Sequence, residues 1–308
     1  MIFKISTQFI ESVREEQLSD ICCEMICKRQ YISCDSTVWE SIKKAIKRHG
    51  STSQKDLLSQ YKGFDIPQEI QKYFTTIDVD LLPYSALEKM LTQPSRLLIE
   101  NSCNEWGVYK NIMGTYKHDR KYKNLFTALE QAKKENRISS LHGGGYTTFV
   151  GLIRENEKGD YANVFKYKVC IIFDRDTDDA SSYDVRKNGL FNFLCGKSST
   201  EITDNDIYSL NQNGYIWHMW YKRTVENYFP NKCFQRLGMN TTVIPTNQSE
   251  RDFYNFGNAP GYNKNQLSLL PQGMERMDYE TGLKKFVVNG ESMTELQLLL
   301  LKFIKIIY

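Results

Sequence analysis

Apolar runs and helical repeats alternate through the middle of the chain. The clearest run, at residues 168–173, is apolar at every central position, as expected of a strand covered on both faces. Shorter strand candidates are residues 96–99, 138–141 and 215–220. Between them, residues 104–116, 125–135 and 146–155 have helical character. This alternation predicts an α/β fold with a mostly parallel sheet flanked by helices.

The two ends of the chain show different patterns. Residues 1–93 predict a mainly helical N-terminal region, residues 94–230 hold the α/β pattern, and residues 231–308 form a C-terminal extension. Within the extension, residues 240–290 are rich in Asn, Gly and Gln, which indicates loops with short elements. Apolar residues recur at helical spacing near the end of the chain: Leu296, Leu299, Leu300, Phe303, Ile304 and Ile307.

The C-terminal repeat predicts an amphipathic helix. Lys302 and Lys305 interrupt the apolar stretch, which is also too short to cross a membrane. We expect this helix to pack on the rest of the fold, or to contact a second subunit or another protein.

Composition narrows the class of protein. Of 308 residues, 41% are hydrophobic and 25% charged, which predicts a packed globular chain with two domains, or one large domain with extensions. The net charge of +3 excludes nucleic-acid binding by bulk attraction and requires a local basic patch instead. No Cys-x-x-Cys pair occurs, so a zinc cluster is not expected. We expect a cytoplasmic protein with reduced thiols and no membrane association.

Acidic side chains follow two of the predicted strands. Glu100 and Asp174 are each the first polar residue after an apolar run, and the carboxyl ends of parallel strands meet at one sheet edge. Asp176 should point the same way as Asp174 if the chain stays extended. Converging carboxylates repel one another, so we expect a divalent metal, or a clamp of Arg and Lys, between them. The alternative makes Asp174 a helix cap and Asp176, Asp178 and Asp179 solvated loop acids.

Three glycines, Gly143, Gly144 and Gly145, lie between a predicted strand and a predicted helix. Glycines there let the backbone approach a phosphate at the helix N-terminus. The alternative is a plain tight turn. Neither the Gly-Lys-Ser/Thr of a phosphate-binding P-loop nor the dinucleotide fingerprint is present.

Two cations and an acid follow the last predicted strand. Lys222 or Arg223 could neutralise charge on a phosphate in the transition state. Glu226 is a candidate for a further metal ligand. The alternative is a surface ion pair at the start of a helix.

Taken in order, these features resemble the Toprim domain shared by topoisomerases, bacterial primases and several nucleases. The resemblance covers the strand ending in Glu100, the glycine turn, and the strand ending in Asp174-Arg175-Asp176. Lys222-Arg223-Thr224-Val225-Glu226-Asn227-Tyr228 resembles the basic-x-x-Glu-Asn-Tyr segment of OLD-type nucleases and of standalone Toprim proteins in bacterial defence. The chain departs from the family at Asn101, where glycine is usual, and in the longer gap that follows.

The resemblance implies a Mg²⁺- or Mn²⁺-dependent nuclease that hydrolyses phosphodiester bonds of DNA, or of RNA. Asp174, Asp176 and Glu226 would hold metal, and Glu100 would be a ligand or the general base. Lys222 or Arg223 would stabilise the transition state. The implied nucleic-acid contacts are Arg175, Arg223 and the three glycines Gly143, Gly144 and Gly145.

The sequence contains no Walker motif for the ATPase that accompanies OLD nucleases. The chain would then be a standalone nuclease, or a subunit driven by a separate protein. The resemblance alone implies an effector of anti-phage defence, activated by a protein partner or by homo-oligomerisation. Two alternatives stay open. One is a primase-like nucleotidyl transferase that uses the same acids, and the other is a non-catalytic module that binds nucleic acid or nucleotide.

Overall fold

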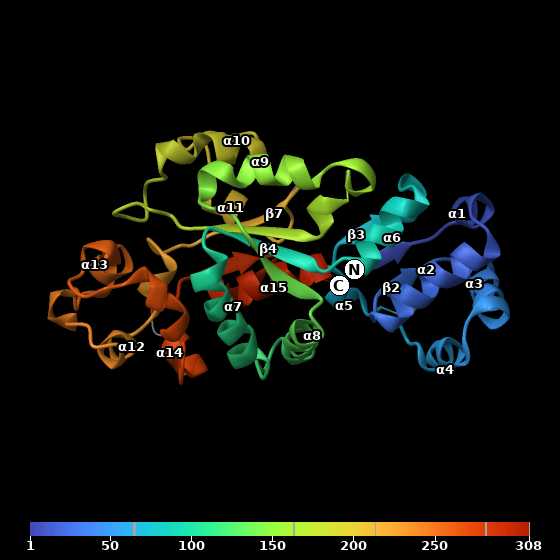
Figure 1. Cartoon of the computed structure of the whole chain (residues 1–308), viewed down its shortest axis with the longest axis horizontal. Coiled ribbons are helices and arrows are strands. Elements are labelled where there is room, and N and C mark those ends of the chain that lie inside the picture. The colour runs from blue at the N-terminus through green and yellow to red at the C-terminus, as the bar shows by residue number, and fades with distance from the viewer. Residues whose placement is uncertain (64–65, 163, 213, 281, 308) are drawn as a thin grey trace. The chain divides into compact units, whose positions relative to one another are not determined.

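The computed structural model describes residues 1–63, 66–162, 164–212, 214–280 and 282–307 (Figure 1). The chain divides into two compact units. The first unit contains residues 1–95, 154–168 and 304–308, and the second contains residues 96–153 and 169–303. The predicted boundary after residue 93 therefore lies close to a unit boundary, whereas residue 230 lies inside the second unit.

Helices surround a small parallel sheet in the first unit. The strands pair in the order β2-β1-β3, with Phe3 opposite both Ile32 and Ile77. The elements, with η for 3₁₀ helices, are β1 (Ile2–Lys4), α1 (Thr7–Ser12), α2 (Glu15–Cys27), β2 (Tyr31–Ser33), α3 (Ser36–His49), α4 (Thr52–Gln60), α5 (Gln68–Gln71), β3 (Thr76–Asp78), η1 (Val79–Leu81), α6 (Tyr84–Thr92), η2 (Gly159–Tyr161) and η3 (Phe165–Tyr167). The sequence predicted helices in this region but not the sheet.

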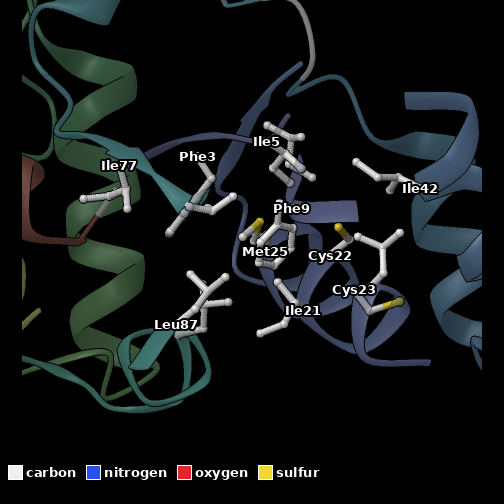
Figure 2. Packing of buried hydrophobic residues seen from close by; sticks show 14 of the residues in the cluster. Phe3, Ile5, Phe9, Ile21, Cys22, Cys23, Met25, Ile42, Ile77 and Leu87 are labelled. Atoms are coloured by element: carbon white, nitrogen blue, oxygen red, sulfur yellow. The ribbon is translucent and has the colours of Figure 1, made fainter. Parts of the chain in front are cut away.

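The core of the first unit lies between this sheet and its helices. Figure 2 shows Phe9, Ile21 and Met25 pointing toward one another, with Phe3 beside them; all four side chains are at most 3% exposed. Local signals fix the helix ends. Asp35, for example, caps α3 by accepting a hydrogen bond of 2.8 Å from the Val38 N–H.

The second unit holds a four-stranded sheet in the order β5-β4-β6-β7. Pairs β4–β6 and β6–β7 are parallel. The predicted α/β class with mostly parallel sheets flanked by helices is therefore confirmed. The elements as far as the last strand of this sheet are β4 (Ser95–Ile99), α7 (Ser102–Tyr116), α8 (Lys123–Lys134), β5 (Ile138–His142), α9 (Tyr146–Asn156), β6 (Val169–Phe173), η4 (Val185–Lys187), α10 (Asn188–Cys195), α11 (Asp204–Ile207) and β7 (Ile216–Met219).

Short elements predominate after β7. They are η5 (Val225–Tyr228), α12 (Asn231–Arg236), η6 (Thr241–Val243), α13 (Gln248–Asp252), η7 (Phe256–Asn258), η8 (Lys264–Leu269), α14 (Arg276–Glu280), the antiparallel hairpin β8 (Lys285–Val288) and β9 (Glu291–Thr294), and α15 (Glu295–Ile307).

Helices lie on both faces of the four-stranded sheet. In Figure 1, α9 and α10 lie on one side of it, and α7, α8 and α15 on the other. Phe191 of α10 packs on Phe173 and Trp217, with ring centroids 6.1 and 6.4 Å away. Because both faces are covered, the loops at the carboxyl ends of the strands are the place for a site.

The C-terminal helix differs from its prediction. Every residue from 295 to 303 is buried, so this part of α15 is not amphipathic. Lys302 donates hydrogen bonds to the carbonyl oxygens of Ile207 and Trp217 instead of facing water. The predicted helix is present, but its expected polar face is not, because Lys302 finds internal partners. Tyr308, the end of the predicted helix, lies outside the described residues.

None of the helices in the described parts of the chain combines the length and the apolar character needed to cross a membrane.

Candidate functional site

Carboxylates gather at the carboxyl ends of β4 and β6. Glu100 follows β4, Asp174 follows β6, and Glu226 comes from η5. Burial holds the pKa of Asp174 well above its usual range, and the charges of Glu100 and Glu226 raise it further. Burial and the charge of Asp176 likewise raise the pKa of Glu100. The structure thus brings all four predicted acids into one electrostatic cluster.

A backbone hydrogen bond holds Asp174 in place. The N–H of Val225 donates to Oδ1 of Asp174 over 3.2 Å. This bond ties the turn that carries Glu226 to strand β6.

Two carboxylate oxygens in the cluster are buried without a hydrogen-bond partner among the described residues: Oε1 of Glu100 and Oε2 of Glu226. The other oxygen of Glu226 accepts from the hydroxyl of Tyr262. A buried unpaired carboxylate oxygen costs about 1–3 kcal/mol or more. These oxygens are the positions at which a bound cation would lower the energy of the protein.

Asp176 lies differently from its prediction. Its φ of 61° is left-handed, so the chain does not stay extended beyond Asp174. The N–H groups of Arg175 and Asp176 both donate to the carbonyl of Arg223 over 3.0 Å, which fixes this turn. The strand ends at Phe173, so Asp174 and Asp176 do not lie two residues apart in an extended segment. The prediction that they face the same way for that reason was therefore wrong.

A buried lysine that the sequence did not indicate pairs with Asp176. Lys187 is fully buried, and its ammonium bonds Oδ2 of Asp176. It also donates to the carbonyl oxygens of Asp174 and Arg175, at 2.8 and 3.3 Å. Lys187 therefore supplies positive charge at the base of the cluster.

The three basic residues that the sequence singled out point elsewhere. Lys222 is 2% exposed and pairs with Asp252 over 2.7 Å. Arg223 pairs with Asp178. Arg175 is fully buried and donates to the hydroxyl of Tyr208 and to nearby carbonyls. The predicted transition-state role of Lys222 and the predicted nucleic-acid contact of Arg175 do not fit these buried positions. The role of Arg223, whose partner Asp178 is 92% exposed, stays a prediction.

Lys264 is the second cation at the cluster. Desolvation lowers its pKa, but the carboxylates of Asp174 and Glu226 outweigh this effect and leave the pKa raised. Its ammonium therefore stays charged. With Tyr262 it comes from the loop-rich segment that sequence patterns could not organise.

The glycine turn connects β5 to α9, as predicted, but two of its amides are occupied. The N–H of Gly143 donates to the carbonyl of Ile99 over 2.8 Å, and that of Gly144 to the carbonyl of Glu100 over 3.1 Å. Neither amide is free for a phosphate in this structure, so the predicted phosphate-binding role of Gly143 and Gly144 does not fit. The turn instead fixes the backbone of Glu100.

Glu105 is a fifth acid, which the sequence analysis missed. It lies in the first turn of α7, where its Oε1 accepts from the N–H of Asn101 over 3.0 Å. Burial raises the pKa of Glu105 to about 8, and the charge of Glu100 adds to the effect. The only signal in the sequence was an acid about one helical turn beyond Glu100. An acid in the first turn of a helix is equally well explained as a residue that stabilises the helix N-terminus.

The donor chemistry fits a hard divalent cation, since carboxylate oxygens are its preferred ligands and two of them are unpaired. The geometry is not that of a finished site. Within the described ranges, no three His, Cys, Asp or Glu side chains are arranged to hold a metal ion as they stand. Ligation by three of the acids therefore requires side-chain rotation, and Asp176 could take part only if it were released from Lys187.

Comparison of the chain with protein-family models, with curated proteins and with solved structures finds no match.

Proposed function

We propose that the chain is a metal-dependent nuclease with a Toprim-like catalytic domain, which hydrolyses phosphodiester bonds of DNA, or of RNA. The observation that supports this most is the cluster of buried carboxylates at the ends of two adjacent parallel strands. The charge of Glu100 raises the pKa of Asp174 there, and Glu226 is tied to the same point through Val225. Such a cluster is costly to fold without a cation.

Mg²⁺ or Mn²⁺, when bound, would polarise the phosphate and lower the pKa of an attacking water. Asp174 and Glu226 would hold the metal, with Asp176 or Glu105 completing the set. Glu100 is placed to accept the proton of the attacking water, because its raised pKa makes it a stronger base than an ordinary glutamate. Lys187 and Lys264 would offset the charge that develops on the phosphate, the role first expected of Lys222.

Metal binding is tested by thermal unfolding in the presence and absence of Mg²⁺ or Mn²⁺. The metal should raise the melting temperature of the wild type and leave Asp174→Asn unchanged. In metal-free buffer Asp174→Asn should melt higher than the wild type, because the raised pKa of the buried Asp174 carboxyl group costs folding free energy at neutral pH and a neutral amide does not. Asp178→Asn is the matched control: it lies in the same loop, its side chain is 92% exposed, and it should respond to metal as the wild type does.

Cleavage is tested on plasmid DNA, single-stranded DNA and RNA with the same proteins. We expect the wild type and Asp178→Asn to cut in the presence of metal, and Asp174→Asn and Glu226→Gln to lose activity. Equal cutting by all four would refute the proposal. Incorporation of labelled nucleotides without loss of substrate would indicate the primase-like alternative, and metal-independent binding without cutting would indicate the non-catalytic one.

The resemblance alone supports a role as a partner-activated or self-associating effector in anti-phage defence. Expression of the wild type and of Asp174→Asn in bacteria, with and without phage infection, tests it. Protection or toxicity that both proteins show equally would contradict a role for the acidic cluster.

A further inference from the structure

A pocket of about 260 Å³ lies beside the turn that carries Glu226. It is formed by residues 227–231 and by the segment around α13. Its charged lining residues are Lys222, Arg251 and Asp278. None of the acids in the cluster described above lines it, so it is a separate site.

Arg251 is the cation of this pocket that has no carboxylate bonded to it. Lys222 is neutralised by Asp252, and Asp278 by Lys232. The guanidinium of Arg251 donates through Nη2 to the carbonyl of Phe229. Its Nη1 is buried and has no partner among the described residues.

The cost of this arrangement indicates an absent ligand. A charged donor buried without a partner loses its hydration and gains no bond in exchange. Burial accordingly lowers the pKa of Arg251. An anion in the pocket would supply the missing bond and the missing charge together.

A second residue of the lining, Asn231, carries an unpartnered atom. Oδ1 of Asn231 is buried and accepts no hydrogen bond from any residue that the structure describes. A ligand with a hydroxyl would donate to it. Rotation of the amide would instead present Nδ2 as a donor to an anion, because the two orientations have nearly the same shape.

We propose that this pocket binds a terminal phosphate group, held by Arg251 and Asn231. A phosphate offers several charged acceptor oxygens to the guanidinium, and an attached sugar offers hydroxyls to Asn231. The pocket is just below the range of about 300–1,000 Å³ typical of small-molecule sites, which suits a phosphate carrying a sugar. A free nucleotide and the phosphorylated end of a nucleic-acid strand present the same chemistry. The proposal goes beyond the nuclease function and does not depend on it.

The pocket is also connected to the acidic cluster. Asn227 donates from Nδ2 to the carbonyl of Arg251 over 2.7 Å. Its Oδ1 accepts from the N–H of Thr224 over 3.0 Å. Asn227 thus bridges Arg251 to the turn of Glu226, so a bound phosphate would stiffen the segment that positions this acid.

Calorimetric titration in buffer with a chelator tests the proposal. Without metal the acidic cluster repels anions, so phosphate binding reports the pocket. The probes are inorganic phosphate, adenosine monophosphate, and one oligonucleotide with and without a 5′-phosphate. We expect the wild type to bind phosphate. If a strand end is the natural source, the phosphorylated oligonucleotide should bind more tightly than the unphosphorylated one. If a nucleotide is the natural source, adenosine monophosphate should bind.

Variants locate the bound phosphate. Arg251→Gln should weaken binding by about tenfold or more, since a charged hydrogen bond is lost. Asn231→Asp is nearly isosteric and adds a negative charge, so it should weaken binding as well while leaving the fold unchanged, as circular dichroism would show. Arg48→Gln, a change at an exposed arginine of the first unit, should bind as the wild type does. No binding by the wild type at millimolar phosphate, or equal binding by Asn231→Asp, would overturn the proposal.

Discussion

Of the three glycines in the turn, Gly143 lies closest to neighbouring atoms, those of Phe149 and Ile99. Gly143→Ala is therefore the sharpest single test of the fold around Glu100. A Cβ at this position would lie 2.1 Å from Cε1 of Phe149 and 2.8 Å from the carbonyl oxygen of Ile99. Carbon atoms in good contact are about 3.5–4.0 Å apart. Phe149 is fully buried, and Ile99 is backbone of the central sheet, so neither can move away cheaply.

The magnitude follows from these two contacts. Overpacking of a core costs about 1–3 kcal/mol. If the turn shifts to relieve the clash, the Gly143–Ile99 hydrogen bond weakens, which adds about 1 kcal/mol. Backbone strain adds nothing, because among these three glycines only Gly144 and Gly145 have a positive φ.

Urea unfolding followed by circular dichroism measures the effect as a shift of the transition midpoint. Gly151→Ala is the matched control, since Gly151 lies in α9 and nothing lies within 4 Å of its added Cβ. The control should stabilise the protein by about 0.5–1 kcal/mol through helix propensity. A Gly143→Ala protein as stable as the control would show that the turn is not packed against β4 as described.

Three further predictions concern buried polar groups. Asp252→Asn should destabilise the fold by about 3–5 kcal/mol, measured by urea unfolding, because it leaves Lys222 buried without its counter-charge. Burial lowers the pKa of His218 from 6.5 to about 4. The unfolded chain therefore binds a proton first on acidification, and the stability of the wild type relative to His218→Gln should fall as the pH drops from 6.5 to 4. Burial also lowers the pKa of Lys302 from 10.5 to about 7. The stability of the wild type relative to Lys302→Met should therefore rise as the pH increases from 7 to 10.5. A stability difference that does not change with pH would contradict this.

The central strand of the second unit was predictable because every one of its side chains is buried. Residues 169–173 therefore carry a continuous apolar signal that ends abruptly at Asp174. The strands of the first unit gave no comparable signal. Each is three residues long, and β3 buries only Ile77, so their place in a sheet comes from pairing with β1 and not from local pattern.

The acids were predictable and their counter-charges were not. Glu100 and Asp174 directly follow buried strands, so topology alone brings them together. Lys187 reaches the site from η4 and Lys264 from η8, and both elements are short and follow loops without periodic pattern. Lys222 was the more visible candidate because it follows a strand, but β7 ends in Met219 and the chain turns its side chain toward Asp252.

The position of Glu226 depends on three bonds from its immediate neighbours in the chain. Val225 donates to Asp174, Asn227 donates to the carbonyl of Arg251, and Tyr228 donates to the buried Glu295. These bonds lead to the acidic cluster, to the phosphate pocket and to α15, respectively. A change at any of the three ends should therefore alter the placement of Glu226. The phosphate pocket is the end that a ligand can occupy without entering the acidic cluster. Phosphate binding and metal affinity should consequently be coupled in the wild type, and this coupling should disappear in Asn227→Ala.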